Sequence, residues 1–266
     1  MDSAKGESKM KILNSKVLIT GSNRGIGLAL AKELAKRKAQ LHLQMRAEAP
    51  ALVDELLRMG AASVKVWVAD LGDREQIEKW LSALQNENID ILINNAGQLT
   101  GGLLEEQKIE EIYTMFQVNV NALVQLTHGL LPGMLLRGRG KIVNHSSVSA
   151  VMHFPCASTY AASKAAVLAF TNCLQLELQG TGVSALCLLT PGIQTRMFRE
   201  IEEKYGKNFE VPKDSISPEA YAVRICEAIE SDEVFLNPCG ATGLGLLVAR
   251  HLPWIFRRAA SARFKR

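Results

Sequence analysis

The amino-acid sequence predicts an α/β fold, in which helices cover both faces of a doubly wound parallel sheet. Short apolar runs alternate with longer segments that carry apolar residues at helical spacing, and the alternation continues to about residue 236. A glycine-rich turn joins the first apolar run to the first helical segment. Because helical crossovers join parallel strands, the loops that follow the strands are expected at one edge of the sheet.

Each apolar run supplies a strand, and most are followed by a helix. The predicted strands are short and rich in apolar residues, and they cover residues 17–20, 39–45, 64–68, 89–93, 141–144, 183–189 and 234–236. The predicted helices have longer periodic patterns, over residues 26–38, 49–59, 74–84, 105–136 and 158–178. A last helix is expected to begin at Ser217, which supplies a capping hydroxyl before Pro218 and Glu219.

The length and composition fit one large domain. Of the 266 residues, 47% are hydrophobic and 22% are charged, as in ordinary globular proteins. We expect a single domain over residues 1–239, with a variable loop at about 191–217, and a tail over residues 240–266. The tail differs in charge, because no acidic residue follows Glu233 while six basic residues do.

Cysteine and histidine usage argues against a disulfide framework and against a metal site. The five cysteines are scattered without a C-x-x-C pair, and the five histidines lack metal-ligand spacing. The first residues lack the apolar core of a secretory signal, and no run approaches the ~20 apolar residues of a membrane span. We therefore expect a cytoplasmic protein in a reducing compartment, without a metal.

The glycine-rich turn is typical of a phosphate-binding site. Residues 20–27 read TGSNRGIG, between the first strand and the first helix. Glycine lets the backbone approach a pyrophosphate closely, and the helix start attracts its negative charge. The alternative is a glycine-rich turn without a ligand. In its strand–turn–helix context, the turn predicts a Rossmann-like fold with a dinucleotide cofactor.

The end of the second strand favours NADP(H). NAD sites usually carry an acid there for the ribose 2′-hydroxyl, whereas a 2′-phosphate requires a cation. This strand ends at Arg46 with no acid at the turn, and Arg24 in the glycine turn is a second candidate cation. The alternative is that both arginines are merely solvated.

Tyr160 and Lys164 are the first candidates for catalysis. They lie four residues apart in a predicted helix, so their side chains share one face. A nearby ammonium favours phenolate and lowers the pKa of a tyrosine, which brings the hydroxyl closer to proton transfer at neutral pH. Ser147 precedes them and could polarise the same substrate oxygen. Taken alone, the Tyr-x-x-x-Lys spacing also occurs on solvated helices.

Together, and in this order, these motifs resemble the short-chain dehydrogenase/reductase family over roughly residues 16–236. The glycine turn resembles the family's T-G-x-x-x-G-I-G, and residues 94–97 match its N-N-A-G. Asp70 takes the position of the acid near the adenine ring, and residues 191–195 resemble the P-G-x-x-x-T segment beside the nicotinamide. The length fits the family's standard branch of ~250 residues, and the two cations fit its NADP-preferring type.

The resemblance implies hydride transfer between NADP(H) and a carbonyl or secondary-alcohol carbon. Tyr160 would be the general acid/base, Ser147 would hydrogen-bond the developing alkoxide, and Lys164 would lower the tyrosine pKa and hold the nicotinamide ribose. Asn119 would position a water that connects the lysine to solvent. The implied cofactor-binding residues are Gly21, Ser22, Asn23, Arg24, Gly25, Ile26, Gly27, Arg46, Asp70, Leu71, Asn95, Ala96, Gly97, Tyr160, Lys164, Pro191, Gly192, Ile193 and Thr195.

Several alternatives remain open. Asn121 competes with Asn119, and Ser146 competes with Ser147. Ser149 and the following alanine replace a glycine that is often found in the family. The protein could instead be a non-catalytic NADP-binding sensor, although the intact tetrad argues against this, or a nucleotide-dependent epimerase or dehydratase. No motif that reads nucleic acid accompanies the basic residues.

The family's variable substrate loop corresponds to residues 196–216, and its aromatic and apolar residues suggest a lid over a lipophilic small-molecule carbonyl or alcohol. The proposed lid residues are Met197, Phe198, Tyr205 and Phe209. The resemblance also implies a homodimer or homotetramer, paired through helices 105–136 and 158–178, whose apolar faces are broad.

The tail over residues 240–266 mixes apolar and basic residues, and Pro253 divides it into two short segments. Such a mixture suits peripheral contact with a membrane surface, with Trp254 at the interface and arginines against anionic headgroups. The competing interpretation is that the tail folds back over the substrate pocket or a partner subunit.

Overall fold

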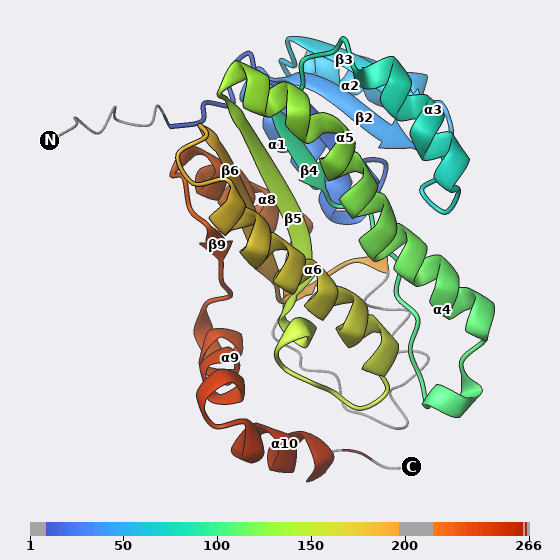
Figure 1. Cartoon of the computed structure of the whole chain (residues 1–266), viewed down its shortest axis with the longest axis vertical. Helices are drawn as coiled ribbons and strands as arrows, with labels where there is room; N and C mark the ends of the chain where they lie inside the picture. The colour runs from blue at the N-terminus through green and yellow to red at the C-terminus, as the bar shows by residue number, and fades with distance from the viewer. Residues whose placement is uncertain (1–8, 197–214, 263, 265–266) are drawn as a thin grey trace, which may run out of the picture.

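A seven-stranded parallel sheet forms the centre of the structure, a computed structural model that describes residues 9–196, 215–262 and 264 (Figure 1). The strand order is β3-β2-β1-β4-β5-β6-β9. In chain order these strands are β1 (Lys16–Thr20), β2 (Gln40–Met45), β3 (Ser63–Val68), β4 (Ile91–Asn94), β5 (Gly140–Ser147), β6 (Val183–Thr190) and β9 (Phe235–Leu236). The order reverses at β1, which pairs with β2 on one side and β4 on the other, and the predicted doubly wound fold is confirmed.

Helices cover both faces of the sheet, with α5 and α6 in front of it in Figure 1. The helices packed on one face are α1 (Gly25–Lys36), α2 (Pro50–Arg58) and α8 (Pro218–Glu230). Those packed on the other face are α3 (Arg74–Leu84), α5 (Ala122–Arg137) and α6 (Ser158–Glu177), with α4 (Ile109–Phe116) leading into α5. Beyond β9, the chain continues into α9 (Gly240–His251) and α10 (Pro253–Ala262).

The two-sided cover explains why the strands read as continuous apolar runs. In β1, Val17 and Ile19 point into the core under α1 and α8, while Leu18 points into the core under α5 and α6. Successive side chains of a strand face opposite sides, so a strand buried on both faces needs apolar residues at every position. Helix α8 begins as predicted, since the Ser217 hydroxyl accepts a hydrogen bond from the Ala220 amide at 3.1 Å.

The predicted continuous helix over residues 105–136 is wrong. The chain instead forms a short 3₁₀ turn at Leu104–Glu106, then α4, then a π-helical turn at Gln117–Asn121, and only then α5. The π-turn contains Asn119, whose side-chain amide is hydrogen-bonded to the backbone of Gln98 on a neighbouring loop. Apolar periodicity cannot reveal such a turn, because it changes the backbone hydrogen bonding without interrupting the buried face.

β5 is longer than predicted, because its pairing with β6 continues through His145↔Leu188 to Ser147↔Thr190. The polar residues at its end obscured the strand pattern in the sequence. A further difference lies in residues 191–217, predicted to be irregular, where β7 (Gly192–Ile193) pairs with β8 (Ser215–Ile216). The proposed lid residues at 197, 198, 205 and 209 lie outside the described part of the chain.

Candidate active site

A cavity of about 590 Å³ runs along the carboxyl ends of the central strands. It begins at the glycine turn after β1, passes the ends of β2 and β4, and reaches the ends of β5 and β6. The predicted site residues that line it are Gly21, Asn23, Arg24, Gly25, Ile26, Gly27, Arg46, Asp70, Leu71, Asn95, Ala96, Gly97, Ser147, Tyr160, Lys164, Pro191, Gly192, Ile193 and Thr195. Ser22 and Asn119 do not line it.

The glycine turn forms a cradle that larger residues would fill. A Cβ atom on Gly27 would overlap the carbonyl oxygen of Gly21, and one on Gly21 would lie 3.0 Å from the Ala96 Cα. Gly21 also has a positive φ of 64°, a conformation that glycine adopts without strain. Exposed backbone beside the first turn of α1 therefore faces the cavity, as a pyrophosphate site requires.

Hydrogen bonds fix the glycine turn to the end of β4. The Thr20 hydroxyl accepts from the backbone amides of Asn95 at 3.0 Å and Ala96 at 2.9 Å, and the Asn95 side chain donates to the Thr20 carbonyl at 2.9 Å. Gln44 holds the other side, since its side-chain oxygen accepts from the Gly21 amide at 2.9 Å. Ser22 turns away, fully buried, and its hydroxyl bonds the Gln44 carbonyl.

The two candidate cations lie at the end of the cavity that is formed by the glycine turn and the end of β2. Arg24 and Arg46 both line the cavity and are solvent-exposed, and neither forms an ion pair within the described residues. Asp70 and Leu71 line the same end. The cradle, the cations and a cavity lined by residues from Arg46 to Lys164 fit a phosphorylated dinucleotide, which would lie from Arg46 toward Lys164.

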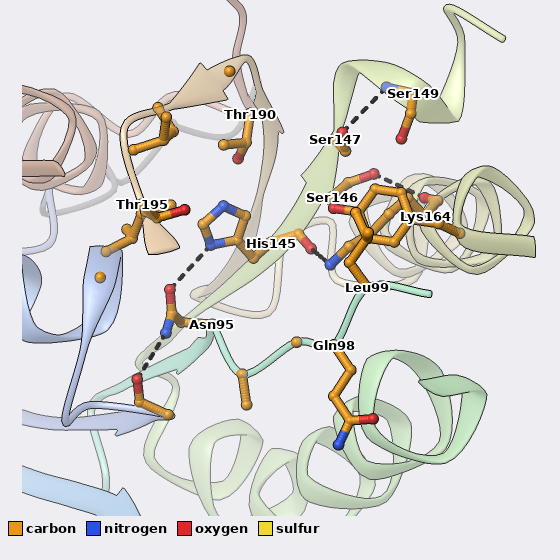
Figure 2. A pocket seen from close by; sticks show the side chains of 18 of the residues that line it. Asn95, Gln98, Leu99, His145, Ser146, Ser147, Ser149, Lys164, Thr190 and Thr195 are labelled. Atoms are coloured by element: carbon orange, nitrogen blue, oxygen red, sulfur yellow. Dashed lines mark hydrogen bonds between the residues drawn. The ribbon is translucent and has the colours of Figure 1, made fainter. Parts of the chain in front are cut away.

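Ser147, Tyr160 and Lys164 line the opposite end of the cavity, near the end of β5. Figure 2 shows Ser147 and Lys164 at this end. Tyr160 and Lys164 lie on one face of α6, and the lysine nitrogen is 5.7 Å from the centre of the tyrosine ring. Ser147 forms a hydrogen bond with Tyr160 and accepts another from the Ser149 amide at 3.2 Å. The hydroxyl of the neighbouring Ser146 is not directed at Tyr160, because it donates to the Lys164 carbonyl at 2.8 Å. The geometry therefore favours Ser147 over Ser146.

The expectation that Lys164 lowers the pKa of Tyr160 is wrong for this structure. Burial raises the pKa of Tyr160 to about 12, and the hydrogen bond with Ser147 offsets only part of the rise. Burial also lowers the pKa of Lys164 to about 8. The ammonium is directed to the His145 carbonyl, to which it donates at 2.8 Å. The phenol therefore keeps its proton at neutral pH, as a proton donor must.

Asn119 is buried behind this group. Its side-chain oxygen accepts from the Gln98 amide at 2.8 Å, and its nitrogen donates to the Gln98 carbonyl at 2.9 Å and to Ser163 at 3.1 Å. A Cβ on Gly97 would lie 3.5 Å from Asn119 Oδ1 and 3.6 Å from Lys164 Nζ, so the asparagine and the lysine flank the same glycine. Asn121 is exposed and bonds only the Gln117 side chain in the described structure, so the geometry favours Asn119.

The wall beyond Tyr160 is mainly apolar, and sequence reasoning missed it. Its apolar residues include Leu99, Met152, Phe154 and Phe256. Phe256 comes from α10 and packs edge-on against Phe154, with ring centres 5.5 Å apart. Leu246 of α9 is buried in the same cluster as Met152. Only the interpretation of the tail as a cover for the pocket pointed to this wall.

Three kinds of comparison show which known proteins the chain is similar to. Residues 15–206 match the short chain dehydrogenase family. The chain is 31% identical over 229 residues to the ketoacyl reductase HetN of Nostoc sp., which covers 83% of this chain and 78% of that protein. It is 29% identical over 229 residues to the 3-oxoacyl-acyl-carrier-protein reductase FabG of Haemophilus influenzae, with coverage of 81% and 90%. A short-chain dehydrogenase from Sphingobium yanoikuyae, solved in complex with NADPH, superposes with a TM-score of 0.78 at 26% identity and covers 95% of this chain and 96% of that one.

Proposed function

Because the chain belongs to the short-chain dehydrogenase family, and is thus an oxidoreductase, we propose that it transfers hydride between NADP(H) and a lipophilic ketone or secondary alcohol. The observation that carries the proposal is one continuous cavity, with a nucleotide cradle at one end and Ser147 and Tyr160 at the other. The apolar wall formed by Leu99, Phe154 and Phe256 supports a lipophilic substrate.

The proposed chemistry assigns one role to each polar group. When bound, the nicotinamide supplies or accepts the hydride. In the reductive direction, Tyr160 donates its proton to the developing alkoxide, and the Ser147 hydroxyl hydrogen-bonds the same oxygen. Lys164 holds the nicotinamide ribose, and Asn119 fixes the loop at Gln98 beside it. The raised pKa of Tyr160 suits reduction, since the phenol is protonated at neutral pH.

A substrate screen tests the proposal. Purified protein is mixed with NADPH and a panel of ketones of increasing apolar size, including 3-oxoacyl thioesters of the kind that the related reductases are named for, and NADPH absorbance is followed. We expect turnover that rises with apolar size. A non-catalytic sensor would bind NADPH without oxidising it, and an epimerase or dehydratase would convert its substrate without net loss of NADPH.

Arg46→Ala should abolish the preference for NADPH. A charge-assisted contact with phosphate contributes ~1.5–3 kcal/mol, so NADPH affinity should fall roughly ten- to a hundredfold while NADH affinity stays unchanged. Calorimetric titration of both nucleotides measures the effect. The control is Arg58→Ala, an exposed arginine on α2 that bonds the Asp54 carbonyl and should change neither affinity. Tighter binding of NADH than NADPH by the wild-type protein would contradict the proposed cofactor.

We also propose a homodimer or homotetramer, paired through the helices around α5 and α6. Large apolar side chains on these helices are exposed, including Tyr113 at 64%, Leu136 at 90% and Leu176 at 68%. Ala169→Arg, on the exposed face of α6, should lower the mass measured by light scattering toward that of a monomer. Ala51→Arg on α2 is the matched control and should leave the mass unchanged. A monomeric wild-type protein at micromolar concentration would contradict the pairing.

We propose that α9 and α10 close the substrate end of the cavity. The contact between Phe256 and Phe154 supports this role, and Phe256→Ala should raise KM for apolar substrates roughly tenfold. Trp254, which is 67% exposed, lies on the outer side of the same helix, and Trp254→Ala should not change KM. A peripheral membrane contact predicts the reverse pattern, in which Trp254→Ala reduces binding to anionic vesicles and Phe256→Ala does not. None of the helices in the described chain is both long and apolar enough to cross a bilayer.

A further inference from the structure

The side chain of His145 lines the cavity but has no role in the chemistry proposed above. It lies near the end of β5, 7% exposed, and its carbonyl holds the Lys164 ammonium. Figure 2 shows the ring extending toward the part of the cavity that carries Asn95 and Thr195, while the lysine approaches the backbone from the other side. The ring therefore lies between the glycine turn and the catalytic end.

The hydrogen bonds of Asn95 determine which ring nitrogen of His145 carries the proton. The Asn95 amide nitrogen donates to the carbonyls of Thr20 at 2.9 Å and Gly21 at 3.3 Å, which fixes the amide orientation. Asn95 Oδ1 then faces His145 Nδ1 at 3.2 Å. An amide oxygen can only accept, so Nδ1 must donate. Burial and the nearby Lys164 lower the pKa of His145 to about 3, so the ring is neutral and Nε2 has a free lone pair.

This lone pair is accessible from the cavity. His145 has two ring nitrogens. Within the described structure, Nδ1 has a hydrogen-bond partner and Nε2 has none. The fully buried side-chain polar atoms without a partner in that structure are Trp80 Nε1, Asn94 Oδ1 and Ser149 Oγ, and His145 Nε2 is not among them. Nε2 therefore keeps accessible surface, and the space that its side chain borders is the cavity.

We propose that His145 Nε2 accepts a hydrogen bond from the carboxamide group of bound NADP(H) and so orients the nicotinamide ring. The inference rests on the proposed function. An acceptor suits the carboxamide NH₂ and not the pyrophosphate, whose oxygens can only accept. The carboxamide is favoured over the ribose as the donor to Nε2. His145 points toward Thr195, which belongs to the segment that by resemblance lies beside the nicotinamide, whereas Lys164 is assigned to the ribose. His145 is thus a positioning residue, held in the required tautomer by Asn95.

Calorimetric titration of His145→Phe tests the proposal with three nucleotides. NADP⁺ carries the carboxamide, its nicotinic acid analogue carries a carboxylate instead, and 2′,5′-ADP lacks the nicotinamide half. The variant should bind NADP⁺ about tenfold more weakly, bind 2′,5′-ADP as tightly as the wild type, and discriminate less between NADP⁺ and the nicotinic acid analogue. His153→Phe, which changes an exposed histidine outside the cavity lining, is the matched control and should behave as the wild type.

Nitrogen-15 NMR of the wild-type protein gives a second test, which does not depend on whether His145→Phe folds. The imidazole of His145 should show a protonated Nδ1 and an unprotonated Nε2, and the Nε2 signal should shift on addition of NADP⁺ but not of 2′,5′-ADP. Unchanged NADP⁺ affinity in His145→Phe, an equal loss for NADP⁺ and 2′,5′-ADP, or a protonated Nε2 in the free protein would each overturn the inference. Absence of 2′,5′-ADP binding by the wild type would instead contradict the proposed preference for NADP(H).

Discussion

Tyr160→Phe is expected to lower kcat for ketone reduction by roughly 10²–10⁴-fold, because the substitution removes the proposed general acid and little else. The ring keeps its shape and its packing on α6, so the cavity and the cofactor cradle should remain intact. NADPH affinity should therefore stay within about twofold of the wild-type value, since the lost hydroxyl mainly serves the transition state. Stopped-flow measurement of NADPH oxidation, together with calorimetric titration, separates the two effects.

Tyr113→Phe provides the matched control for this experiment. Tyr113 lies on α4 with 64% of its surface exposed, and it does not line the cavity. Loss of its hydroxyl should leave both kcat and NADPH affinity unchanged. Undiminished ketone reduction by Tyr160→Phe would exclude Tyr160 as the acid, and the hydroxyls of Ser147, Ser149 and Thr190, which line the same cavity, would then be tested in its place.

Lys164→Ala is expected to impair both nucleotide binding and turnover. The substitution removes the proposed contact with the nicotinamide ribose, which should weaken NADPH binding roughly ten- to a hundredfold. It also leaves the His145 carbonyl without its 2.8 Å partner, so β5 loses a bond beside Ser147 and kcat should fall as well. A fall in kcat at saturating NADPH distinguishes this double effect from weaker binding alone.

The pH profile gives an independent measure of the same lysine. Burial lowers the pKa of Lys164 to about 8, so the ammonium is present below that pH and is lost above it. Ketone reduction should therefore be constant near neutral pH and decline as the pH rises through about 8. Lys164→Arg keeps its charge at higher pH and should remove this decline, even if its basal rate is lower. The control Lys79→Ala, at an exposed position on α3, should reproduce the wild-type profile.

Much of the fold was predictable because its central strands are buried on both faces. Residues such as Val17, Leu18 and Ile19 must all be apolar in that situation, and each run then marks a strand. The glycine turn was predictable for a different reason, since a Cβ on Gly27 would overlap the backbone of Gly21. Local sequence carries both signals.

Features that depend on distant contacts could not be predicted from the sequence. The π-turn at Asn119 accompanies its bonds to Gln98 on another loop, and the neutral state of His145 depends on burial and on Lys164. The pKa of Tyr160 was mispredicted because spacing on a helix indicates proximity to a charge but not the extent of burial. The fold thus follows from local patterns, whereas the properties of the site follow from the packing around it.

The distance along the sequence between the glycine turn and Phe256 has a consequence for biosynthesis. The proposed nucleotide cradle is built from β1, β4 and the turns that follow them, which are synthesised before α10, whereas the proposed substrate wall includes a side chain from α10. Domains begin to fold from the N-terminus during translation, so a nascent chain can assemble a nucleotide-binding half before its substrate chamber has a complete wall. On the proposed function, the glycine turn is therefore available to a nucleotide before α10 has been synthesised, whereas the proposed apolar substrate chamber is complete only after α10 has been added.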